Sequence, residues 1–182
     1  LRTERLAETA AADPLALDDA EWEQLLRADG ADLDALARVA DDVRRYTVGE
    51  TVTLVVNRNL TSSGYGTQFD LDDVAAIAAD AHELGATELC VQGILPPTTD
   101  TRAYLDIARA AKAGAPGIHL HAYRPQDVCD LADRGGLGLG GALAALRDAG
   151  VDTVPGTGVK VLSERVRGLV APGDLEVDRW VE

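Results

Sequence analysis

Four short β-rich runs recur along the chain at intervals of roughly thirty residues, and a helical pattern fills each interval. The runs begin near positions 52, 87, 118 and 151. Parallel strands are joined by long crossovers, usually helices, whereas antiparallel strands need hairpin turns, which the sequence lacks. The rhythm therefore predicts an α/β protein with a parallel sheet. Four strands are too few to close an eight-stranded barrel, so we expect either a half-barrel or an open sheet.

Capping and turn residues set the expected boundaries of these elements. The first strand is expected over 51–60, because its near-continuous apolar character is typical of a buried parallel strand. Further strands are expected over 87–92, 118–123 and 151–154. Asp70 and Pro125 suit helix starts, and glycines suit helix ends. The helices are expected over 70–84, 102–113, 125–135, 139–149 and 158–168.

The first fifty residues predict helices only. Asp18 and Glu21 have the spacing of a capping box that starts one helix, and Gly30 is expected to end it. An amphipathic stripe at helical spacing follows at once. We therefore expect an N-terminal helical segment over 1–50 and the α/β part over 51–182.

The charge balance narrows the function classes. The chain has 31 acidic and 17 basic side chains, a formal net charge of -14, and few aromatic residues. Nucleic-acid backbones and anionic membrane surfaces attract clustered Lys and Arg, so neither is expected as a partner. The acidic, Lys-poor composition is typical of a halophilic protein, or of one that avoids aggregation by self-repulsion. Because no apolar stretch is long enough for a membrane span, we expect a soluble, cytoplasmic protein.

Polar residues stand where the first two strands end. In parallel α/β folds ligands bind at the carboxyl ends of strands. Asn57, Arg58 and Asn59 supply amide and guanidinium donors suited to a carboxylate or phosphate, or else they hold the first loop in place. Gln92 and Gly93 form a turn where a ligand can approach the backbone closely, or a plain strand-ending turn. We treat all five as candidate ligand-binding residues.

The third strand alternates polar and apolar residues. His119, His121 and Tyr123 are expected on one face and three apolar residues on the other. The two histidines suit substrate or cofactor contact, metal binding, or a hydrogen-bonded place in the core. No third ligand is identifiable nearby, so no metal site is expected.

Other catalytic motifs are missing from the sequence. There is no phosphate-cradling P-loop and no nucleophile elbow, and the glycine-rich run at 136–141 follows a helix, which favours a connector. Cys90 and Cys129 lie far apart in the sequence and belong to no metal-spaced cluster. They are expected to be separate, reduced thiols.

Four segments carry a resemblance to a known family: VTLVVNRNL at 52–60, ATELCVQG at 86–93, IHLHAYRPQDV at 118–128 and GVDTVPGTGVKVL at 150–162. Together they resemble the tyrosine-coupling subunit of the radical-SAM deazaflavin synthase family, and related menaquinone-pathway enzymes share much of the pattern. The resemblance implies a partial TIM-type (β/α) barrel. It also implies S-adenosylmethionine and a 4Fe-4S cluster as cofactors of a transferase that joins the 4-hydroxybenzyl group of tyrosine to 5-amino-6-(D-ribitylamino)uracil.

By position, the resemblance implies contact with S-adenosylmethionine at Gln92 and Gly93. Asn57, Asn59, His119 and His121 would line the barrel lumen, where a small-molecule substrate binds. A companion deazaflavin synthase subunit, or self-association of the chain, is the expected protein partner.

The sequence departs from that family in its cysteines. The family holds its cluster with a CxxxCxxC motif after the first strand, where this chain has the sequence TSSGYG at 61–66. The family also continues through further strand and helix units. The sequence therefore leaves open a transferase homologue and a non-catalytic binding or interaction module derived from it.

Overall fold

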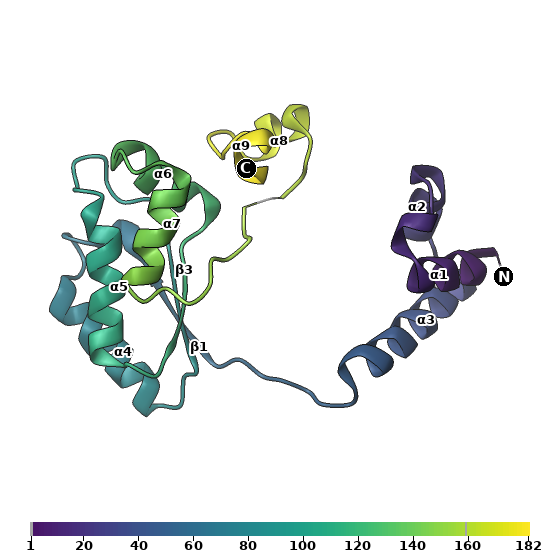
Figure 1. The fold of residues 1–182 in the computed structure, drawn as a ribbon, viewed down its shortest axis with the longest axis horizontal. Coiled ribbons are helices and arrows are strands. Elements are labelled where there is room, and N and C mark those ends of the chain that lie inside the picture. The colour runs from purple at the N-terminus through teal and green to yellow at the C-terminus, as the bar shows by residue number, and fades with distance from the viewer. Residues whose placement is uncertain (1, 159) are drawn as a thin grey trace. The chain divides into compact units, whose positions relative to one another are not determined.

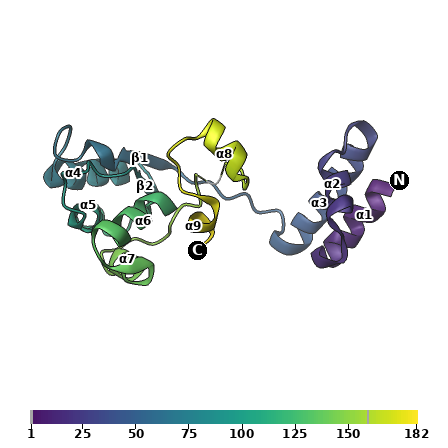
Figure 2. The same cartoon turned by 90° about the horizontal axis from the view of Figure 1, so that it is seen from above.

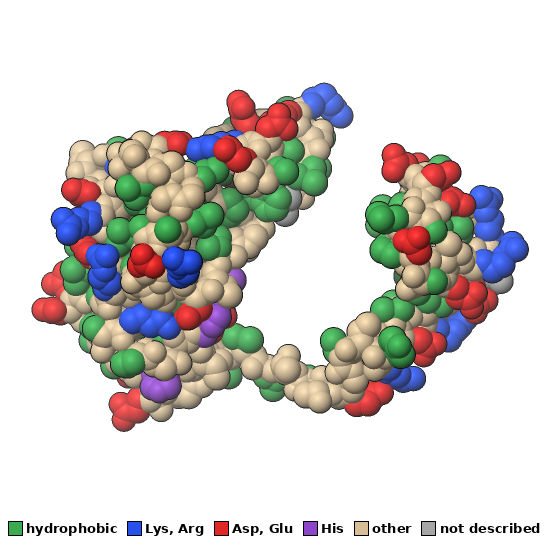
Figure 3. All heavy atoms as spheres, viewed as in Figure 1, with side chains coloured by type: hydrophobic (Ala, Val, Ile, Leu, Met, Phe, Trp, Pro, Cys, Tyr) green, Lys and Arg blue, Asp and Glu red, His purple; other side chains and the backbone are tan. Residues whose placement is uncertain are grey.

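The computed structural model describes residues 2–158 and 160–182, and the chain divides into two compact units, Leu1–Leu54 and Val55–Glu182. The sequence placed this division between residues 50 and 51. Each unit has its own hydrophobic core. Acidic and basic side chains are interspersed over the surface seen in Figure 3, and no continuous basic patch is visible on that face.

The regular elements among the described residues of the first unit are all helices. Its elements are α1 (Arg2–Ala12), the 3-10 turn η1 (Pro14–Ala16), α2 (Asp19–Leu26) and α3 (Gly30–Val48). Asp18 caps α2 in the predicted capping box with Glu21. Gly30 does not end α2, contrary to the prediction; it is the first residue of α3, and its N–H donates to the Asp29 carboxylate. Leu6, Ala7, Leu17 and Leu25 form the buried core of this unit.

The second unit is α/β and contains a small parallel sheet (Figure 1). The strands lie in the order β1-β2-β3 and all pair in parallel. This confirms the α/β class and the parallel pairing. Its elements are β1 (Asn57–Thr61), η2 (Ser62–Gly64), α4 (Leu71–Glu83), β2 (Glu88–Gln92), α5 (Arg102–Gly114), β3 (His119–Ala122), α6 (Pro125–Arg134), α7 (Gly138–Asp148), α8 (Glu164–Val170) and α9 (Val177–Val181).

One face of the sheet is covered by helices and forms the core. Leu89 and Val91 of β2, and Leu120 and Ala122 of β3, are fully buried. They belong to one cluster with apolar residues of α4, α5, α6 and α7, and these helices lie along one side of the sheet in Figures 1 and 2. The alternate residues of β2 and β3 are only partly buried. The sheet thus has a helix-covered apolar face and a polar face.

The predicted strand over 51–60 is wrong in its first half. Strand β1 begins only at Asn57, and the apolar side chains before it are 82%, 83%, 64% and 54% exposed at Val52, Leu54, Val55 and Val56. The cause is the pairing register, since Asn57 pairs with Glu88, the first residue of β2. Val56, just before this pair, is held by Thr87 and Glu88: its carbonyl accepts from both of their N–H groups, and its own N–H donates to the Thr87 hydroxyl. Apolar composition alone therefore did not make a strand.

The predicted strand over 151–154 is reduced to a single parallel bridge between Thr153 and His121. The helix predicted over 158–168 is also misplaced, because α8 begins at Glu164. Gly158 lies before α8 in a turn and has a positive φ of 94°. No helix within the described ranges is long and apolar enough to cross a bilayer.

Candidate functional site on the polar face of the sheet

The strand register gathers the polar residues of three strands on the face without helices. Asn57 pairs with Glu88, and Glu88 pairs with His119. In the next row on the same face, Asn59 pairs with Cys90, and Cys90 with His121. Asn57, Asn59, His119 and His121, which the resemblance placed in a lumen, therefore share one surface. The sequence analysis expected Asn57 where the first strand ends, which is wrong: Asn57 and His119 are the first residues of β1 and β3.

Two residues of the predicted site lie elsewhere. Arg58 pairs with Leu89, so alternation directs its side chain to the opposite face from Asn57 and Asn59. Tyr123 was expected beside the histidines, but β3 ends at Ala122 and the alternation ends with it. The Tyr123 ring is 1% exposed, packs edge-to-face on Tyr104 and donates a hydrogen bond to the Tyr104 carbonyl. Tyr123 is a core residue.

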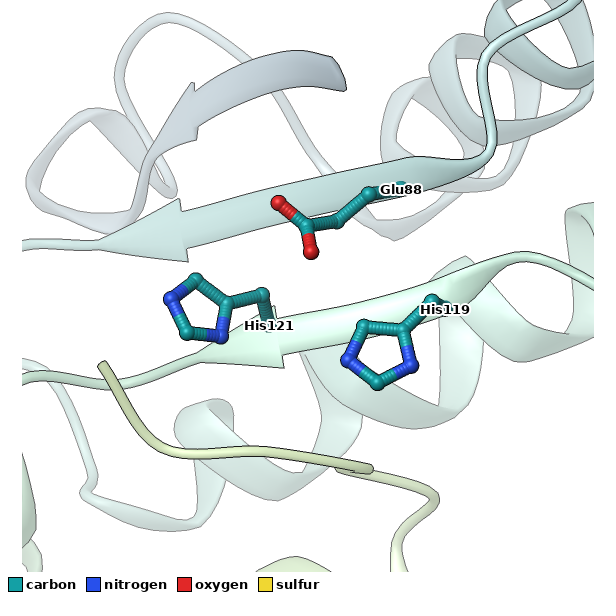
Figure 4. Close-up of side chains that lie close together, drawn as sticks. All are labelled: Glu88, His119 and His121. Carbon is teal, nitrogen blue, oxygen red and sulfur yellow. The ribbon is translucent and has the colours of Figure 1, made fainter. Parts of the chain in front are cut away.

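Glu88 is the residue that the sequence analysis missed. One ligand atom from each of Glu88, His119 and His121 lies within 4.8 Å of the others. Figure 4 shows the Glu88 carboxylate on the same side of the sheet as the two imidazole rings. The expectation that no third ligand lies nearby was therefore wrong. Only the register between β2 and β3 could have revealed Glu88.

Thr153 joins the two histidines. Its hydroxyl lies 2.8 Å from Nε2 of His119 and 2.6 Å from Nδ1 of His121. A hydroxyl group has one proton to donate, so at least one of these two ring nitrogens must carry a proton and donate to it. Both rings are thus aimed at one point above the polar face.

The turn after β2 is held by the protein itself. The N–H of Gly93 donates to Asp127, and the Gly93 carbonyl accepts a hydrogen bond from the fully buried Ser62 hydroxyl. A Cβ at Gly93 would lie 3.3 Å from both the Ser63 nitrogen and Thr61 Cγ2. With a φ of 125°, the position also favours glycine over any other residue. The loop after β1 and the start of α6 therefore fix the Gln92-Gly93 turn.

Asp127 anchors this turn from inside the protein. Its side chain is 0% exposed and accepts hydrogen bonds from the Gly93 N–H and from both the backbone and the guanidinium of Arg124. The hydrogen bond to Asp127 raises the pKa of Arg124. These donors satisfy a buried carboxylate that would be costly to bury without partners. Asp127 thus connects the ends of β2 and β3.

A cavity of about 260 Å³ lies next to Gln92, between the strand ends and the C-terminal helices. Its lining contains three cationic side chains and one acidic one, and Lys160 pairs with Asp174 at 2.6 Å. That hydrogen bond lowers the pKa of Asp174. The indole Nε1 of Trp180 is buried without a hydrogen-bond partner among the described residues. The full lining is Gln92, Arg124, Gln126, Thr157, Gly158, Lys160, Arg167, Asp174, Leu175 and Trp180.

The two cysteines are separate free thiols, as predicted. Cys90 lies on β2 on the polar face, and Cys129 is buried in α6. Burial, more than any other cause, raises the pKa of both thiols, which disfavours the thiolates that bind iron. Two thiols on different elements do not fit a cluster held by three thiolates of one loop.

The chain is similar in sequence to several FO synthases and to a related transferase. The chain is 41% identical over 192 residues to the FO synthase of Streptomyces avermitilis and 42% identical over 192 residues to that of Streptomyces coelicolor. Each alignment covers 96% of this chain. It is also 36% identical over 161 residues, 81% of the chain, to the 5-amino-6-(D-ribitylamino)uracil--L-tyrosine 4-hydroxyphenyl transferase 1 of Methanosarcina barkeri. No family model matches.

The chain spans only part of each relative. It covers 22% of the length of the two FO synthases and 43% of the length of the transferase. The similarity nevertheless includes almost the whole of this chain. The resemblance to the tyrosine-coupling deazaflavin synthase family is therefore confirmed by homologues that carry those names.

Proposed function

We propose that the chain acts in deazaflavin coenzyme biosynthesis, in the step that joins the 4-hydroxybenzyl group of tyrosine to 5-amino-6-(D-ribitylamino)uracil. The observation that supports this most directly is identity of about 40% to FO synthases over nearly the whole chain. The polar face of the sheet supplies a surface on which such a substrate can be bound. We assign to this chain the binding part of the activity.

The fold supports this assignment as a partial TIM-type barrel. In such barrels helices cover the outside of a parallel sheet, and the side chains of the other face point into the barrel. The order β1-β2-β3, the helices on one face and the polar residues on the other agree with that architecture. In this proposal the polar face lines the lumen.

The substrate-binding residues follow from the geometry. Asn57, Asn59, His119 and His121 offer amide and imidazole groups that can donate to or accept from ribityl hydroxyls and the uracil ring. Neutral, hydroxyl-rich ligands are recognised by such groups without a net charge. Arg58 and Tyr123 are left out, because they do not lie on this face.

Gln92 is the residue we assign to S-adenosylmethionine, because it lines the cavity beside Arg124. In the family, S-adenosylmethionine bound to a 4Fe-4S cluster supplies the radical. The thiols of this chain do not fit that cluster, so we propose that the 182 residues do not anchor it alone. A companion deazaflavin synthase subunit, or a second copy of the chain, would then contribute to any complete catalytic site.

The presence of only two cysteines in the 182-residue sequence favours a second candidate function. In this alternative the chain is a non-catalytic module that retains the family's binding surface. Iron and sulfide analysis after anaerobic reconstitution separates the two candidates. The expected result for a binding module is far less than one cluster per chain. Four irons per chain, together with reductive cleavage of S-adenosylmethionine, would show that the chain is a complete radical enzyme.

Calorimetric titration with 5-amino-6-(D-ribitylamino)uracil tests the binding proposal itself. We expect binding to the intact chain and a roughly fivefold weaker Kd for Asn59→Ala, since a lost hydrogen bond is worth about 1 kcal/mol. Arg58→Ala is the matched control, on the same strand but the opposite face, and it should leave the Kd unchanged. An equal loss in both variants, or no heat with the intact chain, would refute the assignment.

A further inference from the structure

We propose that Glu88, His119 and His121 form a binding site for one divalent transition-metal ion, of which Zn²⁺ is the best match. Neither the resemblance nor the relatives' names assign a metal to these residues. The site lies on the polar face, and its existence does not depend on the deazaflavin activity proposed above.

The backbone fixes the relative positions of the three ligands. Glu88 and His119 are paired neighbours on β2 and β3, and His121 follows two residues along β3 on the same face. The three side chains extend from the sheet in the same direction in Figure 4. Strands hold these positions more firmly than loops, so the metal would meet a largely formed site.

The distances agree with a tetrahedral ion after small side-chain rotations. Zn²⁺ binds imidazole nitrogen and carboxylate oxygen at about 2.0–2.2 Å, so its ligand atoms lie about 3.4 Å apart. The three ligand atoms of this site already lie within 4.8 Å of one another. Each therefore needs to move by about 1 Å or less, which a χ rotation of His or Glu provides.

The contacts with Thr153 are a second, independent indication. Ring nitrogens of both histidines already point at one small polar atom, the Thr153 hydroxyl, at 2.8 and 2.6 Å. An ion near that place would receive a lone pair from each ring and displace the hydroxyl. No hydrogen bond or ion pair holds the Glu88 carboxylate elsewhere among the described residues, so it is available as the third ligand.

The donor set selects the type of metal. Imidazole suits Zn²⁺, Co²⁺ and Fe²⁺, whereas Mg²⁺ and Ca²⁺ prefer sets made of oxygen alone. Two imidazoles and one carboxylate leave a fourth position open for water or a ligand, as in catalytic rather than structural zinc sites. A ligand on the polar face would therefore meet the open position of the ion.

The test is metal titration of the full chain, first stripped with a chelator and carrying no affinity tag. We expect one Zn²⁺ per chain by calorimetry, and a Co²⁺ form whose visible absorption is that of a four- or five-coordinate ion. Glu88→Gln and His121→Ala should each weaken the Kd at least about tenfold. Circular dichroism of each variant verifies that the fold is retained.

Two matched controls use the remaining histidine and the nearest thiol. His82→Ala, at an exposed position of α4, should leave the Kd and stoichiometry unchanged. Cys90→Ser, beside His121 on the same face, should also retain binding. The proposal is overturned if the intact chain binds no Zn²⁺, if folded Glu88→Gln and His121→Ala bind like the original, or if Cys90→Ser abolishes binding.

Discussion

Residues 52–56 contain more aliphatic side chains than strand β2, yet they are exposed and those of β2 are buried. The first contains four aliphatic side chains, all more than half exposed, whereas β2 has only two, Leu89 and Val91, and both are fully buried. Helices α4 and α5 cover one face of β2, and strands pair with both of its edges. No described element pairs with 52–55. Burial therefore depends on neighbouring elements, and six variants test how far this difference extends.

The largest loss of stability is expected when the buried Asp127 side chain is removed. Asp127→Ala removes the buried partner of Arg124 and of the Gly93 N–H, which should lower the free energy of unfolding by about 3–5 kcal/mol. Urea denaturation followed by circular dichroism measures the change. A loss below about 1 kcal/mol would show that the turn after β2 is not held from inside.

A matched pair of valines compares the two regions directly. Val91→Ala should lower the free energy of unfolding by about 2–3 kcal/mol, because it removes two buried methyl groups and leaves a cavity. Val55→Ala should change it by less than about 0.5 kcal/mol. Equal losses in the two variants would mean that residues 52–56 are covered in solution.

The polar face is only partly buried, between the buried core and the exposed residues 52–56. Substitution of Thr153 tests how this face binds a metal ion. In Thr153→Val the metal-free form loses two hydrogen bonds to histidine, each worth about 0.5–1.5 kcal/mol, while the metal-bound form loses none. Zn²⁺ should therefore bind at least about fivefold more tightly to Thr153→Val than to the original chain in calorimetry. Weaker binding would mean that the threonine supports the metal instead of competing with it.

The smallest expected effect is the loss, at low pH, of the stabilisation that the Asp130 carboxylate provides. Burial raises the pKa of Asp130, but hydrogen bonds from Arg134 and Tyr104 outweigh it, so the folded-state pKa lies below the ordinary 3.8. The stabilisation is present above pH 3.8 and is lost as pH falls through the lower folded-state pKa. Asp130→Asn should therefore give a flatter stability curve below about pH 4.

The control for this curve is Asp41→Asn on the solvent face of α3. A hydrogen bond from Arg44 lowers the pKa of Asp41 too, but the pair is open to water and weakened by salt. We expect no measurable change in its acid limb at physiological ionic strength. A flattening as large as that of Asp130→Asn would contradict the distinction between covered and exposed carboxylates.

The sequence predicted helix starts well where a capping residue or a proline sets them. The capping residues Asp18 and Asp70 and the helix start at Pro125 occur as expected, because side chain and backbone meet within four residues. The strand expected over 51–60 and the helix expected over 158–168 began several residues later. The start of β1 depends on strand pairing, which the apolar pattern does not report, and the structure gives no local reason for the late start of α8.

The candidate site was predicted in part for the same reason. Alternation within one strand placed His119 and His121 together, and the structure agrees. Glu88 depends on the register between two strands, and Tyr123 on where β3 ends, and neither is visible in a single sequence. Whether these residues bind substrate stays a prediction.

Histidine NMR offers the most direct test that the polar face binds ligand. The chain has three histidines, so the ring signals are few and can be assigned with His82→Ala. On titration with 5-amino-6-(D-ribitylamino)uracil we expect the signals of His119 and His121 to shift together in a saturable way while that of His82 stays in place. Saturable binding that leaves both His119 and His121 unmoved would contradict the proposed site.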